Sequence, residues 1–110
     1  MKASKYIETL KSIGKVRIQP VPPQRIGDTF SVSFAVKGSN VTYDVKMLGQ
    51  HITKLSNNKK GESAELMATM VGIQRIDVEA SNLVSPVPSK SFTMVIIENP
   101  VTNLKVKISL

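Results

Sequence analysis

The sequence predicts an all-β, immunoglobulin-like sandwich of about seven strands, and three observations support this prediction. The 110 residues match the usual size of one domain. Apolar and polar residues alternate in several segments with the two-residue period of strands that are buried on one face. Segments rich in Gly, Asn, Ser and Pro separate these runs at the spacing of turns in a β-sandwich.

The two clearest strands follow one another in the middle of the chain. In residues 29–36 the apolar positions are every second residue from Phe30 to Val36, and residues 40–47 repeat this design from Val41 to Met47. Lys37-Gly38-Ser39 provides the turn between them. We therefore expect these two strands to pair with each other or to face each other across the core.

Five more segments complete the predicted sandwich: residues 16–18, 52–55, 64–70, 76–80 and 92–97. In residues 64–70 the alternation of Ala64, Leu66, Ala68 and Met70 favours a strand over the helix that local propensity suggests. From these patterns the core is predicted to contain Phe30, Phe34, Tyr43, Val45, Ile76, Val78 and Phe92.

The chain divides into a domain and two flanks. Residues 15–98 form the predicted sandwich, residues 1–14 are an N-terminal flank or linker in which Ser4 could cap a short helix, and residues 99–110 are a linker or the start of a following module. No apolar segment reaches the roughly 18 residues of a membrane span, and the first residues lead into no signal segment. If the protein is secreted, this chain is an internal piece.

Charge and cysteine content exclude several classes of function. The net charge is +7, but most of the excess lies at the two ends of the chain. Residues 1–19 carry +4, from Lys2, Lys5, Lys11, Lys15 and Arg17 against Glu8, and Lys105 and Lys107 add two more charges. The middle of the chain therefore carries only +1, whereas a specific nucleic-acid binder concentrates its cations on the folded surface. With no cysteine, the chain has neither a disulfide nor a thiolate metal site.

Residues 72–85 resemble the sixth-strand signature of polycystic kidney disease (PKD) domains, which are immunoglobulin-like modules. In that family a Gly precedes an alternating strand that ends in Ala-x-Asn and is followed by a Val-Ser pair. The matching positions are Gly72, Ile76, Val78, Ala80, Asn82, Val84 and Ser85. Val45-Lys46-Met47-Leu48-Gly49 stands where the family has its Trp-Asp-Phe-Gly-Asp-Gly hallmark, and Gln74 replaces the usual Tyr, so the chain resembles a divergent member.

The resemblance implies a role without catalysis. PKD domains occur in cell-surface ectodomains, where they act as spacers between other domains, mediate adhesion and bear load. Residues 98–106 resemble the seam between tandem PKD modules. The implied setting is extracellular or at the cell surface, with a protein or neighbouring domains of the same chain as partner and contact with a membrane only through the parent protein. The resemblance implies no cofactor.

The residues that could carry chemistry are few. His51 is the only histidine, and a loop histidine is the more ordinary interpretation than a metal ligand. Asp77 and Glu79 could begin a calcium site if Asp44 came near, although pairing with Lys46 or Lys90 is the default. A triad of Ser56, His51 and Asp44 can be drawn, but no nucleophile motif surrounds Ser56. We therefore expect that the chain has no catalytic residue and binds no metal, and that it is not an enzyme.

Asn40-Val41-Thr42 is an N-glycosylation sequon at the start of a predicted strand, so Asn40 is a candidate glycosylation site in a eukaryotic secretory pathway.

Two other functions stay open. A basic β-barrel that binds single-stranded nucleic acid would need exposed aromatic residues, and the pattern leaves only Tyr6 as an exposed ring. A phage or bacterial structural protein that uses the same sandwich for assembly would explain the absence of cysteine.

Overall fold

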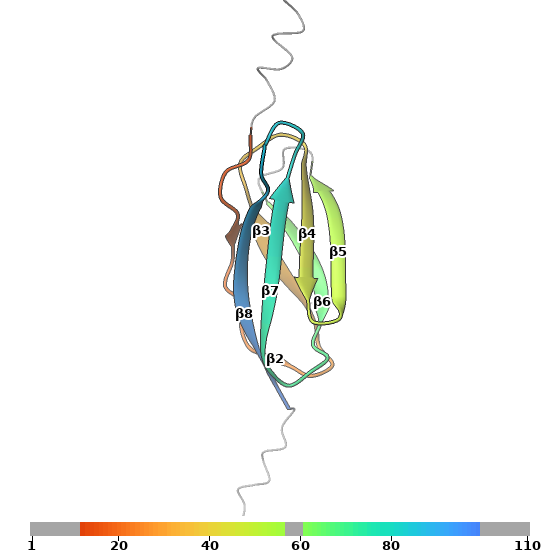
Figure 1. The fold of residues 1–110 in the computed structure, drawn as a ribbon. Coiled ribbons are helices and arrows are strands. Elements are labelled where there is room, and N and C mark those ends of the chain that lie inside the picture. Colours follow the sequence, from red (N-terminus) through yellow and green to blue (C-terminus); the bar gives the residue numbers. More distant parts are fainter. Residues whose placement is uncertain (1–11, 57–60, 100–110) are drawn as a thin grey trace, which may run out of the picture.

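The computed structural model describes residues 12–56 and 61–99, which form a two-layer β-sandwich (Figure 1). Eight strands lie in these residues: β1 (Arg17–Ile18), β2 (Gln24–Arg25), β3 (Thr29–Ala35), β4 (Val41–Met47), β5 (Gln50–Ser56), β6 (Glu62–Met67), β7 (Gly72–Ser81) and β8 (Ser89–Glu98). One sheet has the order β1-β3-β6 and the other the order β2-β8-β7-β4-β5. The sequence therefore predicted the fold class correctly, and missed only the two-residue strand β2. The described residues include no helix that could span a membrane.

The strands β3 and β4 belong to different sheets and face each other across the core. Phe34 of β3 and Tyr43 of β4 meet in an edge-to-face contact with ring centroids 4.7 Å apart. Of the predicted core residues, those that the structure buries are Phe30, Phe34, Tyr43, Val45, Ile76 and Val78. Burial raises the pKa of the Tyr43 hydroxyl, and the nearby Glu62 carboxylate adds to this rise.

The prediction that Phe92 lies in the core is wrong, because its residue is 53% exposed. In β8 the residues Thr93, Val95 and Ile97 point inward, and Phe92 points outward with Met94 and Ile96. A nearly continuous apolar strand lacks the alternation that would reveal which set of residues is buried. Only the pairing with β7 decides the face.

Met70 is also not on the buried face, because β6 ends at Met67 and the chain then leaves the sheet. Ala64, Leu66 and Ala68 are buried as predicted, whereas Met70 is exposed in the connection to β7. The strand itself forms despite its helix-favouring residues, since its alternation matches the pairing with β3.

Polar side chains join the two sheets along the edge formed by β5 and β6. The side-chain amide of Gln50 donates to the Met67 carbonyl oxygen and accepts from the Met67 amide, both at 2.8 Å. Lys54 of β5 pairs with the Glu62 carboxylate at 3.3 Å and donates to the Ser63 carbonyl oxygen. These contacts satisfy backbone groups of β6 that an edge strand otherwise exposes.

The described chain enters and leaves the sandwich at opposite ends (Figure 1). We call the end with the β3–β4 and β7–β8 loops the N pole; there the Ile13 amide donates to Ser85 Oγ at 2.8 Å and the Gly14 amide to the Lys37 carbonyl oxygen at 2.9 Å. Gly38 permits this crossing, because a Cβ at that position would lie 3.0 Å from the Ile13 side chain. We call the opposite end the C pole, where β8 finishes beside residues 26–28.

Candidate functional site

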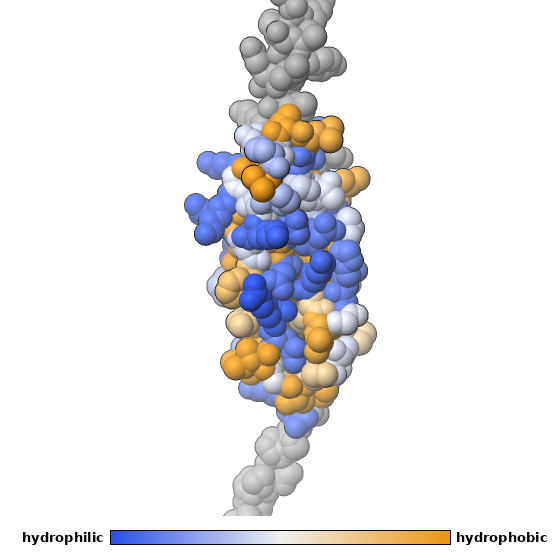
Figure 2. Space-filling view, in the orientation of Figure 1, coloured by the Kyte–Doolittle hydropathy of each residue, from blue (hydrophilic) through white to orange (hydrophobic). Residues whose placement is uncertain are grey.

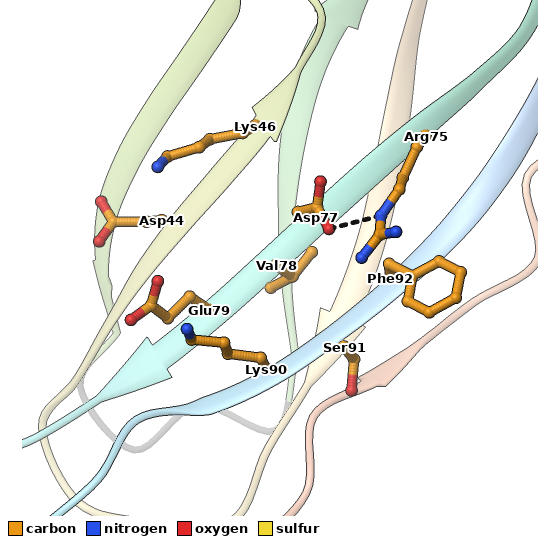
Figure 3. Close-up of a pocket in the computed structure, with 9 residues that line it drawn as sticks. All are labelled: Asp44, Lys46, Arg75, Asp77, Val78, Glu79, Lys90, Ser91 and Phe92. Atoms are coloured by element: carbon orange, nitrogen blue, oxygen red, sulfur yellow. Dashed lines mark hydrogen bonds and ion pairs between the residues drawn. The ribbon is translucent and has the colours of Figure 1, made fainter.

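The outer face of the larger sheet carries a shallow depression of about 370 Å³ across the middle of β4, β7 and β8. Figure 3 shows the residues around it: Asp44, Lys46, Arg75, Asp77, Val78, Glu79, Lys90, Ser91 and Phe92. Charged residues on this face follow from the alternation of β4 and β7, whose other faces supply the core.

Acidic and basic side chains are mixed around this depression. Across the strands, Lys46 stands opposite Asp77, and Glu79 stands opposite both Asp44 and Lys90. Asp77 and Glu79 therefore each stand opposite a lysine, which is the arrangement expected of a solvated sheet face. The sequence predicted the pairing of these acids with Lys46 and Lys90, and the strand register agrees with it.

The Arg75 guanidinium makes two side-chain contacts at this site. Its Nε donates to Asp77 Oδ1 at 2.8 Å, and its Cζ lies 4.0 Å from the centroid of the Phe92 ring (Figure 3). Contacts of this kind at exposed positions contribute about 0.5–1 kcal/mol. Phe92 is thus an exposed aromatic ring that the sequence pattern assigned to the core, and Arg75 covers it.

The exposed Phe92 bears on the nucleic-acid alternative. A sequence-tolerant single-strand binder stacks successive bases on several exposed rings along a basic groove. Within residues 12–56 and 61–99, Phe92 is the one exposed aromatic ring, and the depression beside it is lined by three acidic and three basic residues. Tyr6, the other ring expected to be exposed, lies outside the described residues.

The acids do not form a cation site in the described part of the chain. Asp44 and Glu79 are neighbours, as a calcium site would require, but Lys46 and Lys90 stand beside them. No group of three His, Cys, Asp or Glu side chains that could hold a metal ion occurs among the residues that the structure places. Calcium takes six to eight oxygen ligands.

The three residues of the candidate triad, Ser56, His51 and Asp44, do not come together in the structure. His51 Nε2 lies 3.3 Å from Asp44 Oδ1, and Thr53 Oγ1 donates to the same oxygen at 2.8 Å. Ser56, however, is buried at the other end of β5, opposite Val41, which places it roughly 17 Å along the strand from His51. This arrangement supplies no nucleophile for His51.

Asn40 lies exposed in the β3–β4 loop at the N pole, immediately before β4. Its φ of 51° is in the left-handed region, which Asn tolerates better than most residues. Thr42, the third residue of the sequon, is half-buried on β4. The position leaves the Asn40 side chain within reach of solvent.

Comparison with known proteins identifies the fold. The sequence matches no protein-family model and no curated protein. Among solved structures, the PKD domain of an M14-like peptidase from Thermoplasmatales archaeon SCGC AB-540-F20 superposes with a TM-score of 0.64, at 14% identity over 82% of this chain and 99% of that one. The PKD domain of the human VPS10 domain-containing receptor SorCS2 superposes with a TM-score of 0.62, at 19% identity over 84% of this chain and 80% of that one. The chain has the immunoglobulin-like fold of PKD domains.

Proposed function

We propose that this chain is a non-catalytic spacer and adhesion module of a larger cell-surface ectodomain and transmits tension along a string of domains. The two solved PKD domains compared above belong to larger proteins, one a peptidase and the other a receptor. The depression on its charged face has balanced charge and no convergent nucleophile and base among the described residues.

The observation that carries the proposal is the course of the chain through the sandwich. Residues 12–14 enter at the N pole and Asn99 leaves at the C pole (Figure 1). A module with this geometry adds its full length to a string, and tension between its neighbours runs along its strands. A domain whose two ends lie side by side would instead project from the string, and the tension would not run along its strands.

The strands that receive this tension are paired side by side. β2 runs parallel to β8, with Gln24 opposite Ile97 and Arg25 opposite Glu98. The Ile26 amide adds a hydrogen bond of 2.9 Å to the Glu98 carbonyl oxygen. Because the N-terminal flank pulls β2 towards the N pole and Asn99 pulls β8 towards the C pole, these bonds are loaded together in shear.

The same proposal gives Asn40 a role. In a eukaryotic secretory pathway its sequon is a substrate for N-glycosylation, and the exposed loop at the N pole leaves room for the glycan. A glycan there would shield one end of the module and leave the charged face of the larger sheet free.

Single-molecule stretching of the chain within a polyprotein tests the load-bearing role. Ile26→Pro removes the amide that donates to Glu98, so it should lower the unfolding force, whereas Ile26→Val keeps the donor and should not. Thr93→Pro in β8 should also lower the force, since it distorts the strand that carries the load. Equal unfolding forces for Ile26→Pro and Ile26→Val would refute the proposed shear element.

A further inference from the structure

Strand β8 has a free edge over most of its length. It pairs with β7 from Ser89 to Ile97, whereas β2 covers its other edge only opposite Ile97 and Glu98. No further strand within residues 12–56 and 61–99 pairs with β8. An open strand edge of this kind can accept a strand from another chain.

The backbone groups at this edge belong to Lys90, Phe92 and Met94. The Glu98 carbonyl oxygen accepts from the Ile26 amide, so the backbone of Glu98 faces the β2 side of the strand. Because successive residues of a strand point their amides and carbonyls to opposite edges, every second residue before Glu98 faces this side as well. The backbone groups of Lys90, Phe92 and Met94 therefore point away from β7, towards the part of the edge that no strand of the described chain covers.

The side chains along this edge are apolar and exposed on the outer face of the larger sheet. Phe92, Met94 and Ile96 are 53%, 49% and 48% exposed, and Ile73, which stands opposite Ile96 on β7, is 69% exposed. Figure 2 shows hydrophilic residues in the centre of this face and hydrophobic ones along the side where β8 lies in Figure 1. A strand that combines open backbone groups with exposed apolar side chains is suited to the addition of a further strand.

A groove of about 350 Å³ lies between this edge and β1. Val16 and Ile18 line it on the β1 side, and Lys90 and Phe92 line it on the β8 side. Ser91 Oγ donates to the Val16 carbonyl oxygen at 2.8 Å, which ties the two strands together. The groove therefore exists before any partner binds, and a ligand need not open it.

Two lysines make one end of the groove cationic. Lys15 and Lys90 both line it at the end nearer the N pole, and both are exposed. Glu79 stands opposite Lys90 on β7, but no ion pair joins either lysine to another residue of the described chain. Among the described residues, no Asp or Glu lines the groove. A carboxylate on the ligand would complement this end.

The same charges make a second copy of this chain the poorer occupant. Two copies joined through their β8 edges would bring together two grooves that each carry Lys15 and Lys90 and, among the described residues, no lining carboxylate. An acidic segment of a different protein instead meets only opposite charge at this end.

The free edge fixes the length and pattern of the ligand. Lys90 to Met94 spans four residue steps, or about 14 Å, so an extended segment of about five residues fills it. Side chains of such a segment alternate between its two faces, and those on the outer face would lie beside Lys90, Phe92 and Met94 in turn. The matching pattern is one acidic residue followed by apolar residues at every second position.

We propose that the groove between β1 and β8 binds an extended segment of another protein, which pairs with the free edge of β8, places a carboxylate between Lys15 and Lys90, and packs apolar side chains beside Phe92 and Met94. This inference rests on the proposed adhesion function and names the chemistry of the partner.

Amide hydrogen exchange of the whole chain, followed by NMR, tests the groove directly. The probe is the peptide acetyl-Thr-Glu-Thr-Val-Thr-Val-Thr-amide, whose Glu and Val residues share one face when it runs parallel to β8, as β2 does. Without peptide, the amides of Phe92 and Met94 should exchange fast and those of Ser91 and Thr93, which face β7, should exchange slowly. The peptide should slow exchange at Phe92 and Met94.

Slow exchange at Phe92 and Met94 in the chain alone would mean that the edge is already covered, and it would overturn the inference. No change at these amides with peptide up to about 1 mM would overturn it as well. Protection that grows with protein concentration in the absence of peptide would identify a second copy as the occupant and refute the acidic partner.

Substitutions at the edge separate backbone pairing from side-chain contact. Met94→Pro removes an amide that points away from β7, so the strand should still form while peptide binding weakens about tenfold, because a carbonyl of the peptide loses its donor. The matched control Met94→Ala keeps the amide and should weaken binding less. Thermal unfolding of both variants verifies that the sandwich remains folded, and equal losses of affinity for the two would contradict strand addition.

Charge variants test the acidic end without touching the strand backbone. Lys15→Gln and Lys90→Gln should each weaken peptide binding by about two- to fivefold, as expected of an exposed ion pair. The same peptide with Lys in place of Glu should bind more weakly to the unsubstituted chain, and equal affinity of the two peptides would refute the carboxylate contact.

The outcomes also distinguish the groove from the load-bearing role. If the peptide binds but Ile26→Pro leaves the unfolding force unchanged, the load-bearing function fails and the groove stands. If the force falls but the peptide protects no amide of β8, the groove fails and the load-bearing function stands.

Discussion

Replacing each of two phenylalanines by alanine tests the packing of the sandwich at a position where sequence and structure disagree. Both Phe34 and Phe92 are predicted core residues by pattern, yet Phe34 is 2% exposed and Phe92 is 53% exposed. Phe34→Ala removes a ring that contacts Tyr43 and leaves a cavity between the sheets, so it should cost about 3–5 kcal/mol of unfolding free energy.

Phe92→Ala should cost much less. About half of the residue is already exposed and the removal of its ring leaves no closed cavity, so the burial lost contributes about 1 kcal/mol. Loss of the contact with Arg75 adds about 0.5–1 kcal/mol. The expected total is therefore about 1–2 kcal/mol.

Urea unfolding followed by far-ultraviolet circular dichroism measures both values, and equal slopes against urea verify that the transitions are comparable. Ser33→Ala, an exposed neighbour of Phe34, is the control and should change stability little. Equal losses for the two phenylalanines would mean that the register of β8 is wrong by one residue.

Three further predictions follow from the described residues. Burial, and then the Glu62 carboxylate, raise the pKa of Tyr43 above its ordinary value of 10.0, so the contribution of the neutral hydroxyl to stability should be fully present below pH 10.0 and be lost as the pH rises above it. Tyr43→Phe should flatten this loss when the free energy of unfolding is measured against pH, and an unchanged slope would contradict the assignment. The melting temperature should not change with a chelator or a reductant, since the chain has no cysteine and its described acids form no metal cluster; a large drop with chelator would restore the calcium site. Any binding to single-stranded nucleic acid at low salt should disappear when residues 1–11 are removed. This truncation leaves Ile13 and its contacts in place. Tight binding by the truncated chain at physiological salt would instead favour the nucleic-acid function.

The sequence by itself determined the class of fold and most of the core. Strict alternation in residues 29–36 and 40–47 can bury only one set of side chains, so the pattern alone identifies Phe30, Phe34, Tyr43 and Val45 as core residues. The Gly-then-alternation pattern that ends in Ala80 and Asn82 also pointed to the PKD fold, which the solved structures share.

Only the tertiary structure decided the rest, because those features depend on residues that are distant in sequence. The outward direction of Phe92 follows from its pairing opposite Asp77, and the contact with Arg75 comes from the neighbouring strand. The two-residue strand β2 is too short to have a period, and it exists because β8 offers it backbone partners. The separation of Ser56 from His51, and the exit of the chain at opposite poles, likewise follow from how the strands are ordered in the two sheets, which local sequence does not specify.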